Sequence, residues 1–189
     1  MLLSAKRSTL LIIDVQERLT PAIHELAPLL ANTKILLAAA RALDVPALAS
    51  EQYPKGLGRT LPEISTLLPP ADVSGQPFEK THFSCTAEPG FAELLPPLLH
   101  DQPPRDQIVI AGIEAHVCVL QTALGLKSMG RAVFVVADAC SSRSRANAEL
   151  AFERLRQNGV AVVSTEMVVF EWLHHAGNPA FKNLSALVR

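Results

Sequence analysis

The sequence predicts an α/β protein: a three-layer α/β/α sandwich built on a six-stranded, mostly parallel, doubly wound sheet of the Rossmann-like type. Short apolar runs alternate with longer segments of helical period, as in βαβ units. The runs do not alternate between apolar and polar residues, which is typical of strands covered on both faces. With 189 residues, 49% of them hydrophobic, we expect a single domain over residues 1–189.

Six short apolar runs are expected to form the strands. The first ends at Asp14, and the second enters through Pro46, which suits the beginning of a strand. The third run, which ends at Lys80, has the weakest strand signal. The predicted strands are residues 9–15, 45–50, 77–80, 107–112, 132–138 and 160–164.

Helices are expected where apolar residues recur at steps of three and four. Gly130 stands where the C-terminal cap of a helix falls. Residues 51–77 are rich in Gly and Pro, so we expect mostly loop there, with a short helix near 60–68, and a turn at Pro103-Pro104. The expected helices are residues 28–43, 89–99, 116–129, 144–158, 165–174 and 179–188.

Composition argues against several classes of protein. The 17 basic and 18 acidic residues leave a net charge of -1, so neither nucleic-acid nor membrane binding is expected. No apolar stretch reaches the length of about 18 residues that a spanning helix needs, and the first residues do not resemble a signal peptide. The three cysteines contain no CxxC pair, which favours a reducing compartment; we expect a cytoplasmic protein.

Reactive side chains fall at the carboxyl ends of the predicted strands, where doubly wound sheets bind ligands. Asp14 closes the first strand, Lys80 closes the third, and Cys118 opens the helix after the fourth. A helix N-terminus and a nearby ammonium would lower the pKa of a thiol. A carboxylate could take the thiol proton and return it to a leaving amine. Each residue also has an ordinary explanation, as a cap, a surface lysine or a core cysteine.

Three ordered motifs resemble the signatures of the isochorismatase-like cysteine hydrolases. They are LIIDVQ at residues 11–16, FEK at 78–80 and AGIEAHVCV at 111–119. Their order and separation match the superfamily across nearly the whole chain. Within it, the sequence is most similar to the isochorismatase domain-containing and YcaC-like proteins. That closer similarity lies in residues 51–58, 80–84 and 138–143.

The resemblance implies a metal-independent hydrolase without a cofactor, acting on a small amide or carbonyl compound through a covalent intermediate. It makes Asp14 the base, Lys80 the thiolate stabiliser and Cys118 the nucleophile. It also implies a cis peptide bond between Ile113 and Glu114. That bond would aim the N–H groups of Glu114 and Cys118 at one point as an oxyanion hole. Members commonly form dimers or larger closed rings, so we expect a homo-oligomer.

The sequence differs from two groups of relatives in the superfamily, and these differences argue against the activities of both groups. Nicotinamidases hold a metal through an Asp-x-His pair just after the second strand, with a further histidine downstream. Here residues 50–53 read SEQY, and no histidine lies between His24 and His82, so no metal site is expected. Isochorismate-cleaving members lack the nucleophilic cysteine, so Cys118 argues against that reaction.

Five further residues are candidates for lining the pocket. Tyr53, His82 and Phe83 lie on loops that leave strand ends and could form an apolar wall, although ordinary loop packing explains them equally well. His116 is two residues before Cys118, a step that places it on the opposite side of a helix. Gln16 completes the group.

Two other functions stay open at this point. The chain could be a non-catalytic binding or scaffold protein that has kept the pocket, or a redox-responsive protein that uses Cys118. An NAD site is disfavoured, because the first strand leads into Asp14 without a GxGxxG motif. The small-molecule substrate cannot be read from the loops at 51–77 and 81–90.

Overall fold

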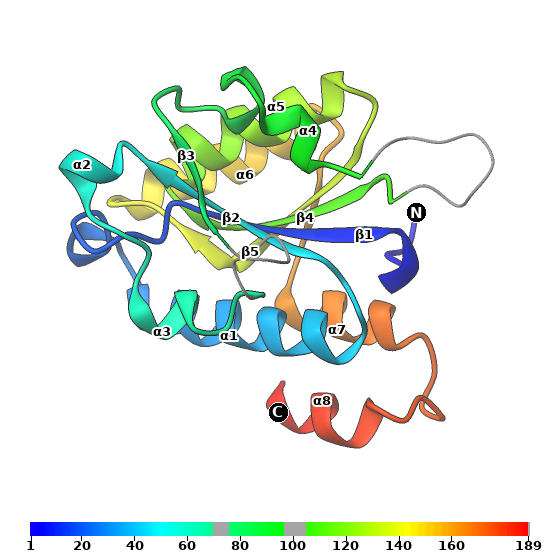
Figure 1. Cartoon of the computed structure of the whole chain (residues 1–189). Coiled ribbons are helices and arrows are strands. Elements are labelled where there is room, and N and C mark those ends of the chain that lie inside the picture. The colour runs from blue at the N-terminus through cyan, green and yellow to red at the C-terminus, as the bar shows by residue number, and fades with distance from the viewer. Residues whose placement is uncertain (70–75, 97–104, 189) are drawn as a thin grey trace.

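A computed structural model describes residues 1–69, 76–96 and 105–188 of the chain. Its sheet has six strands in the order β3-β2-β1-β4-β5-β6, and every adjacent pair is parallel (Figure 1). The predicted α/β class and doubly wound sheet are therefore confirmed. The strands are β1 (Ser8–Ile13), β2 (Ala47–Gln52), β3 (Phe78–Lys80), β4 (Gln107–Ile113), β5 (Ala132–Ser141) and β6 (Ala161–Val163).

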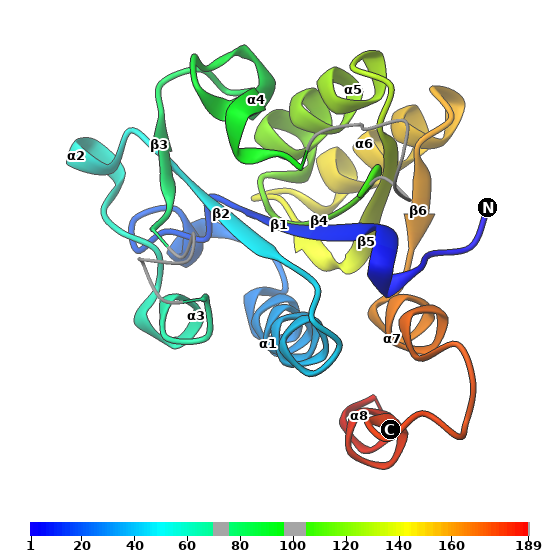
Figure 2. The same cartoon turned by 45° about the vertical axis from the view of Figure 1, so that its right-hand side comes forward.

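Helices cover both faces of the sheet, as the three-layer prediction requires. Figure 2 shows α1, α7 and α8 on one side, with α4, α5 and α6 on the other. The helices are α1 (Leu26–Ala42), α2 (Pro54–Leu57), α3 (Pro62–Ser65), α4 (Phe91–Leu94), α5 (Leu120–Ser128), α6 (Arg145–Gln157), α7 (Thr165–Leu173) and α8 (Phe181–Leu187). Short turns are η1 (Ala5–Arg7), η2 (Thr20–Ala22), η4 (Cys85–Ala87) and η5 (Ala115–Val119).

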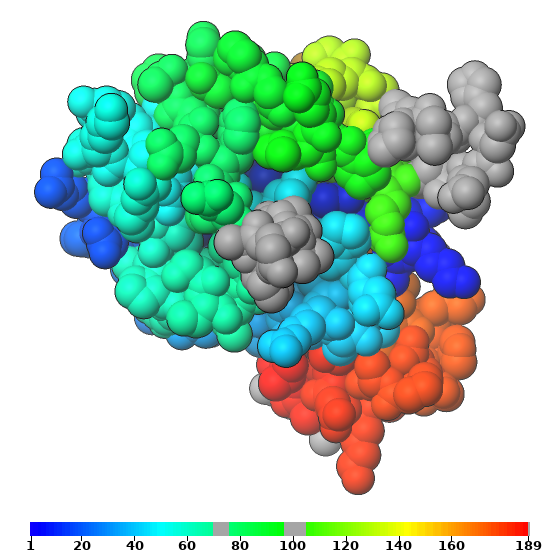
Figure 3. All heavy atoms as spheres, viewed as in Figure 1, coloured from blue at the N-terminus to red at the C-terminus, as the bar shows by residue number. Residues whose placement is uncertain are grey.

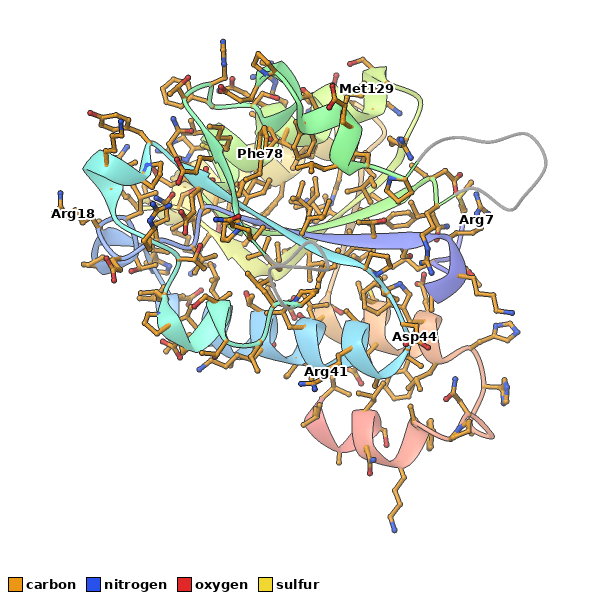
Figure 4. The ribbon with its side chains drawn as sticks, viewed as in Figure 1. Arg7, Arg18, Arg41, Asp44, Phe78 and Met129 are labelled. Carbon is orange, nitrogen blue, oxygen red and sulfur yellow. The ribbon has the colours of Figure 1, made fainter. Side chains whose placement is uncertain are left out.

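The central strand β1 shows why its sequence is apolar without alternation. Leu10 and Ile12 belong to the core between the sheet and α1, whereas Leu11 and Ile13 belong to the core under α5. Since both faces of the strand are covered, every one of its residues is buried. On the second face Phe78 of β3 lies below α4 and packs on Phe91, with ring centroids 5.5 Å apart (Figure 4).

Strand β1 ends one residue before Asp14, earlier than predicted, because Asp14 takes a left-handed conformation with a φ of 52°. Strand β2 is displaced in the other direction and runs on through Glu51 and Gln52. These polar residues continue the strand because they pair with β3, opposite Glu79 and Lys80. Polar side chains therefore lie at the carboxyl ends of β1 and β2, at one edge of the sheet.

Two predicted helices have different limits. The helix expected at 89–99 is only α4, because Leu95 precedes Pro96 and is extended, with a ψ of 137°; its last residues and the Pro103-Pro104 turn lie outside the described residues. The helix expected at 116–129 is divided into a single π-helical turn, η5, and the regular helix α5. Cys118 therefore lies in the π-helical turn and not at the first turn of an α-helix.

Strand β5 is longer than predicted because it contains an irregularity. Its register against β4 shifts between the pairs Ile110–Val135 and Gly112–Cys140. Between these two pairs, Asp138 accepts hydrogen bonds from the N–H and the hydroxyl of Thr165, at 2.8 and 2.9 Å. The irregularity therefore joins the sheet to the beginning of α7.

The C-terminal helices lie at one margin of the molecule. In the space-filling view α7 and α8, in orange and red, form the lower right of the visible face (Figure 3). In Figure 1 α8 lies below α1 and α7, on the side away from the sheet, and it contacts both helices. Within the described part of the chain, none of the helices has the length and apolar character needed to cross a bilayer.

Gly112 on β4 lies opposite Ile13 of β1. Its φ is 126°, and a Cβ at this position would lie 2.1 Å from the carbonyl oxygen of Ile13. A side chain is therefore excluded both by the backbone conformation and by the neighbouring strand. This close approach brings the chain that follows β4 next to Asp14.

We expect Gly112→Ala to lower the free energy of unfolding by more than about 3 kcal/mol, since it combines backbone strain with a backbone clash. Gly130→Ala is the matched control. Its φ is 81°, but nothing lies within 4 Å of the added Cβ, so strain alone should cost about 1 kcal/mol. Urea unfolding of both variants measures the difference, and equal losses would contradict this account.

Candidate functional site

The ends of β1 and β3 meet in a buried ion pair. Lys80 Nζ lies 2.7 Å from Asp14 Oδ2, and both side chains are fully buried. The second carboxylate oxygen of Asp14 accepts a hydrogen bond of 2.7 Å from the hydroxyl of Ser50, on β2. The left-handed backbone at Asp14 directs the chain away from the sheet immediately after this residue. Three adjacent strands therefore contribute to one polar centre.

Lys80 is surrounded by oxygen atoms. Besides Asp14, its Nζ donates to Gln52 Oε1 at 2.6 Å and to the carbonyls of Phe83 and His82 at 3.1 and 3.4 Å. Burial acts to lower the pKa of Lys80, whereas the charge of Asp14 acts to raise it, and the net effect is a raised pKa. The side chain is thus an ammonium at neutral pH.

Gln52 is the site residue that the sequence reasoning missed. Its side-chain oxygen lies between two predicted site residues, 2.6 Å from Lys80 Nζ and 4.0 Å from Cys118 Sγ. Its Nε2 donates to the carbonyl of Thr81 at 2.7 Å. No motif in the sequence pointed to Gln52, because a glutamine just after a predicted strand has no distinctive pattern.

Cys118 is buried, with 6% of its surface exposed, and lies at the same centre. The sequence predicted a lowered pKa for this thiol, and that prediction is wrong. Burial and the negative charge of Asp14 raise the pKa above its ordinary value, and the opposing effect of Lys80 is smaller. The thiol is consequently neutral at pH 7.

Glu114 precedes the turn that carries Cys118. The peptide bond between Ile113 and Glu114 is cis. The Glu114 side chain is directed to the loop after β5, where its Oε2 accepts from the backbone N–H of Arg143 at 2.9 Å and from Arg143 Nε at 3.0 Å. The carboxylate of Glu114 is therefore paired with Arg143.

The five predicted pocket residues lie in different environments. Gln16 is fully buried and does not face solvent: its amide accepts from the N–H of Gln52 and donates to the carbonyl of the same residue. His82 and Phe83 are exposed, on the turn whose carbonyls contact Lys80. His116 is half-buried, with Nδ1 2.9 Å from Ser142 Oγ. Their part in binding a substrate stays a prediction.

Tyr53 lines a surface cleft of about 290 Å³ beside the ion pair. The residues around the cleft come from the loop after β2 and from the end of β3. They are Tyr53, Pro54, Lys55, Glu79, Lys80, Thr81 and Glu88. Lys80 belongs both to the lining of this cleft and to the ion pair.

The three cysteines are all free thiols and buried. Cys85 belongs to the same apolar cluster as Cys118, and burial raises its pKa. Burial also raises the pKa of Cys140, to about 12. In residues 1–69, 76–96 and 105–188, no three His, Cys, Asp or Glu side chains are grouped as a metal site would need.

The chain is similar to known proteins over most of its length. The isochorismatase domain model matches residues 8–167. Isochorismatase domain-containing protein 2 of Danio rerio is 38% identical over 98% of this chain and 89% of its own. The secreted isochorismatase effector Isc1 of Phytophthora sojae is 39% identical over 96% of this chain and 84% of its own.

Among solved structures, the MAR1 ribonuclease of Caenorhabditis elegans aligns with a TM-score of 0.87 and 33% identity. The alignment covers 100% of this chain and 92% of that one. The similarity therefore extends from sequence to fold, over the same strands that bring Asp14, Lys80 and Cys118 together. The chain belongs to the isochorismatase family of hydrolases.

Proposed function

We propose that the chain, acting as one domain, is a cysteine-dependent hydrolase of small amide or carbonyl compounds. The observation that supports this most strongly is the buried Asp14–Lys80 ion pair, with the thiol of Cys118 beside the amide that binds Lys80. Charged side chains are almost never fully buried unless they are paired, and perturbed groups of this kind concentrate at functional sites.

In the first half of the proposed reaction, Asp14 removes the proton of the neutral Cys118 thiol as the sulfur attacks the carbonyl carbon. The C–S bond forms while the electrons of the carbonyl move onto oxygen. The N–H groups of Glu114 and Cys118 are proposed to receive that oxygen. Lys80 stays protonated and compensates the negative charge that develops on sulfur and oxygen.

In the second half, the tetrahedral intermediate expels the leaving amine, which takes the proton from Asp14. This leaves a thioester on Cys118. Water then attacks the thioester carbon, and Asp14 accepts a proton from the water and gives it to the departing sulfur. Every proton passes through one carboxylate, so the cycle ends with a neutral thiol and an ionised Asp14, as it began.

The raised pKa of Cys118 determines how this nucleophile is activated. A preformed thiolate would attack without a base, whereas a neutral thiol needs one within reach. The Asp14 carboxylate, whose negative charge raises the pKa of Cys118, is also the group proposed to remove the thiol proton. We therefore propose activation during attack and not a resting thiolate–lysine pair.

Cys118→Ala should abolish hydrolysis, with at least a 1,000-fold loss of kcat/KM, on the order of other losses of a nucleophile. Cys140→Ala deletes the same sulfur from a buried cysteine outside the site and should retain activity. A panel of amides, carbamates and hydroxamates is assayed against both variants. Undiminished turnover by Cys118→Ala would refute the covalent mechanism.

The same panel separates the alternatives. Because structural relatives, among them the Caenorhabditis elegans protein, are described as ribonucleases, single-stranded RNA is included. A net charge of -1 offers no electrostatic attraction for a polyanion, so we expect no cleavage. A scaffold protein would hydrolyse nothing and would carry an unreactive thiol. A redox protein would form a stable sulfenic acid at Cys118 under mild peroxide without hydrolysing any amide.

The raised pKa predicts how alkylation of Cys118 depends on pH. Below the pKa, the thiolate fraction rises about tenfold for each unit of pH, so the iodoacetamide rate should still increase from pH 7 to pH 9. Asp14→Asn removes the charge that raises the pKa and should speed alkylation at pH 8, while turnover is lost. Peptide mass spectrometry assigns the modified cysteine. A rate that already levels off at pH 6 would show a resting thiolate instead.

We propose that the chain forms a homo-oligomer. Large apolar side chains are exposed in both helical layers: Leu150 on α6 is 63% exposed, and Met167 and Phe170 on α7 are 48% and 42% exposed. Light scattering should give a mass that is a multiple of 20.4 kDa. A single 20.4 kDa species at micromolar concentration would contradict this.

Location in the cytoplasm stays a prediction from the reduced cysteines, and the Phytophthora sojae relative is described as secreted.

A further inference from the structure

The carboxylate of Glu88 binds the turn that follows β3. Its Oε2 accepts from the backbone N–H groups of Thr81 and His82 at 2.8 and 2.9 Å, and from the hydroxyl of Thr81 at 3.3 Å. The ring nitrogen Nδ1 of His82 lies 2.8 Å from the same oxygen. Bonds from the His82 backbone and ring, and from the Thr81 backbone, lower the pKa of Glu88 to about 2. The carboxylate is therefore charged throughout the range in which proteins work.

The turn that Glu88 binds supplies ligands to Lys80. The carbonyls of His82 and Phe83 both point at Lys80 Nζ. The carbonyl of Thr81 accepts from Gln52 Nε2, and the other end of that amide contacts Lys80. Glu88 thus accepts hydrogen bonds from the N–H groups of this turn. Lys80 and Gln52 donate hydrogen bonds to its carbonyl groups.

Apolar packing does not hold this turn in place. The side chains of Thr81, His82 and Phe83 are exposed, and Phe83 keeps 56% of its surface in solvent. The strand before the turn, β3, has three residues and lies at the edge of the sheet. Polar bonds to Glu88 are thus the main restraint on the N–H side of the turn.

We propose that Glu88 is a positioning residue for Lys80: by binding the N–H groups of Thr81 and His82, it fixes the turn so that two carbonyls face the ammonium. The catalytic meaning of this role rests on the proposed function. The structural role does not, because it concerns the geometry of Lys80 and can be measured without substrate.

The position of Lys80 is coupled to the reactivity of Cys118. The ammonium lowers the pKa of the thiol, against burial and the charge of Asp14. If the turn loosens, Lys80 loses two of its oxygen ligands and is no longer held at that distance. The thiolate fraction at a given pH then falls, and alkylation of Cys118 slows.

Glu88→Gln keeps the shape of the side chain and removes its charge. We expect it to slow alkylation of Cys118 by iodoacetamide at pH 8 about tenfold, the effect of a one-unit rise in thiol pKa. Glu93→Gln is the matched control, an exposed glutamate on α4, and should leave the rate unchanged. Hydrogen exchange at the amides of Thr81 and His82 should quicken in Glu88→Gln alone.

A second background shows whether Glu88 acts through Lys80. Asp14→Asn/Lys80→Met removes both members of the buried pair and leaves no unpaired buried charge. If Glu88 acts through Lys80, Glu88→Gln should change the alkylation rate in that background by less than about twofold. If Glu88 acted independently of Lys80, the two effects would add and the full tenfold change would remain. If Glu88→Gln does not fold, Glu88→Asp, which keeps the charge but shortens the reach, takes its place in both backgrounds.

Two results would overturn the proposal. One is faster exchange at Thr81 and His82 with an unchanged alkylation rate, which means that the turn moves without Lys80. The other is an equal slowing in the Asp14→Asn/Lys80→Met background, which means that the turn controls access to the thiol. Neither depends on hydrolysis. Failure of the hydrolase proposal would instead appear as inactivity toward every substrate, with the alkylation differences intact.

Discussion

The ion pair between Asp14 and Lys80 is the interaction on which the site depends. Two charges without solvent are costly to bury, and they persist only where hydrogen bonds satisfy their remaining atoms. Ser50 and Gln52 at the end of β2, together with the carbonyls after β3, provide those bonds. A parallel sheet makes this possible, because the carboxyl ends of its strands emerge at one edge. The fold therefore brings together the two charges and the groups that bind them.

The same pair governs the sulfur beside it. An anion and a cation act on Cys118 in opposite directions, and burial adds to the effect of the anion. The outcome is a protonated thiol near a carboxylate, and a protonated thiol reacts more slowly with oxidants and electrophiles than a thiolate does. This environment differs from that of a cysteine at the beginning of an isolated helix, where the dipole alone would favour ionisation.

Much of the fold was predictable from the sequence, because buried parallel strands are continuous apolar runs and the helical segments between them indicate crossover connections. Asp14, Lys80 and Cys118 were found through motifs. Gln52 was not, since a glutamine beside a strand end carries no distinctive pattern until Lys80 is seen next to it. The π-helical turn at Cys118 and the irregularity in β5 were also missed. Both depend on contacts with distant residues, such as Asp138 with Thr165, that local periodicity does not contain.

The edge position of β3 has a consequence for how the protein loses function. This strand has three residues, pairs only with β2 within the described sheet, and carries the ammonium of the site. Marginal strands of this kind open locally at a small fraction of the global unfolding free energy. Mild heat or denaturant would thus detach Lys80 while the central strands stay intact. Loss of the active arrangement and loss of the fold are separate events, and the first comes at lower stress.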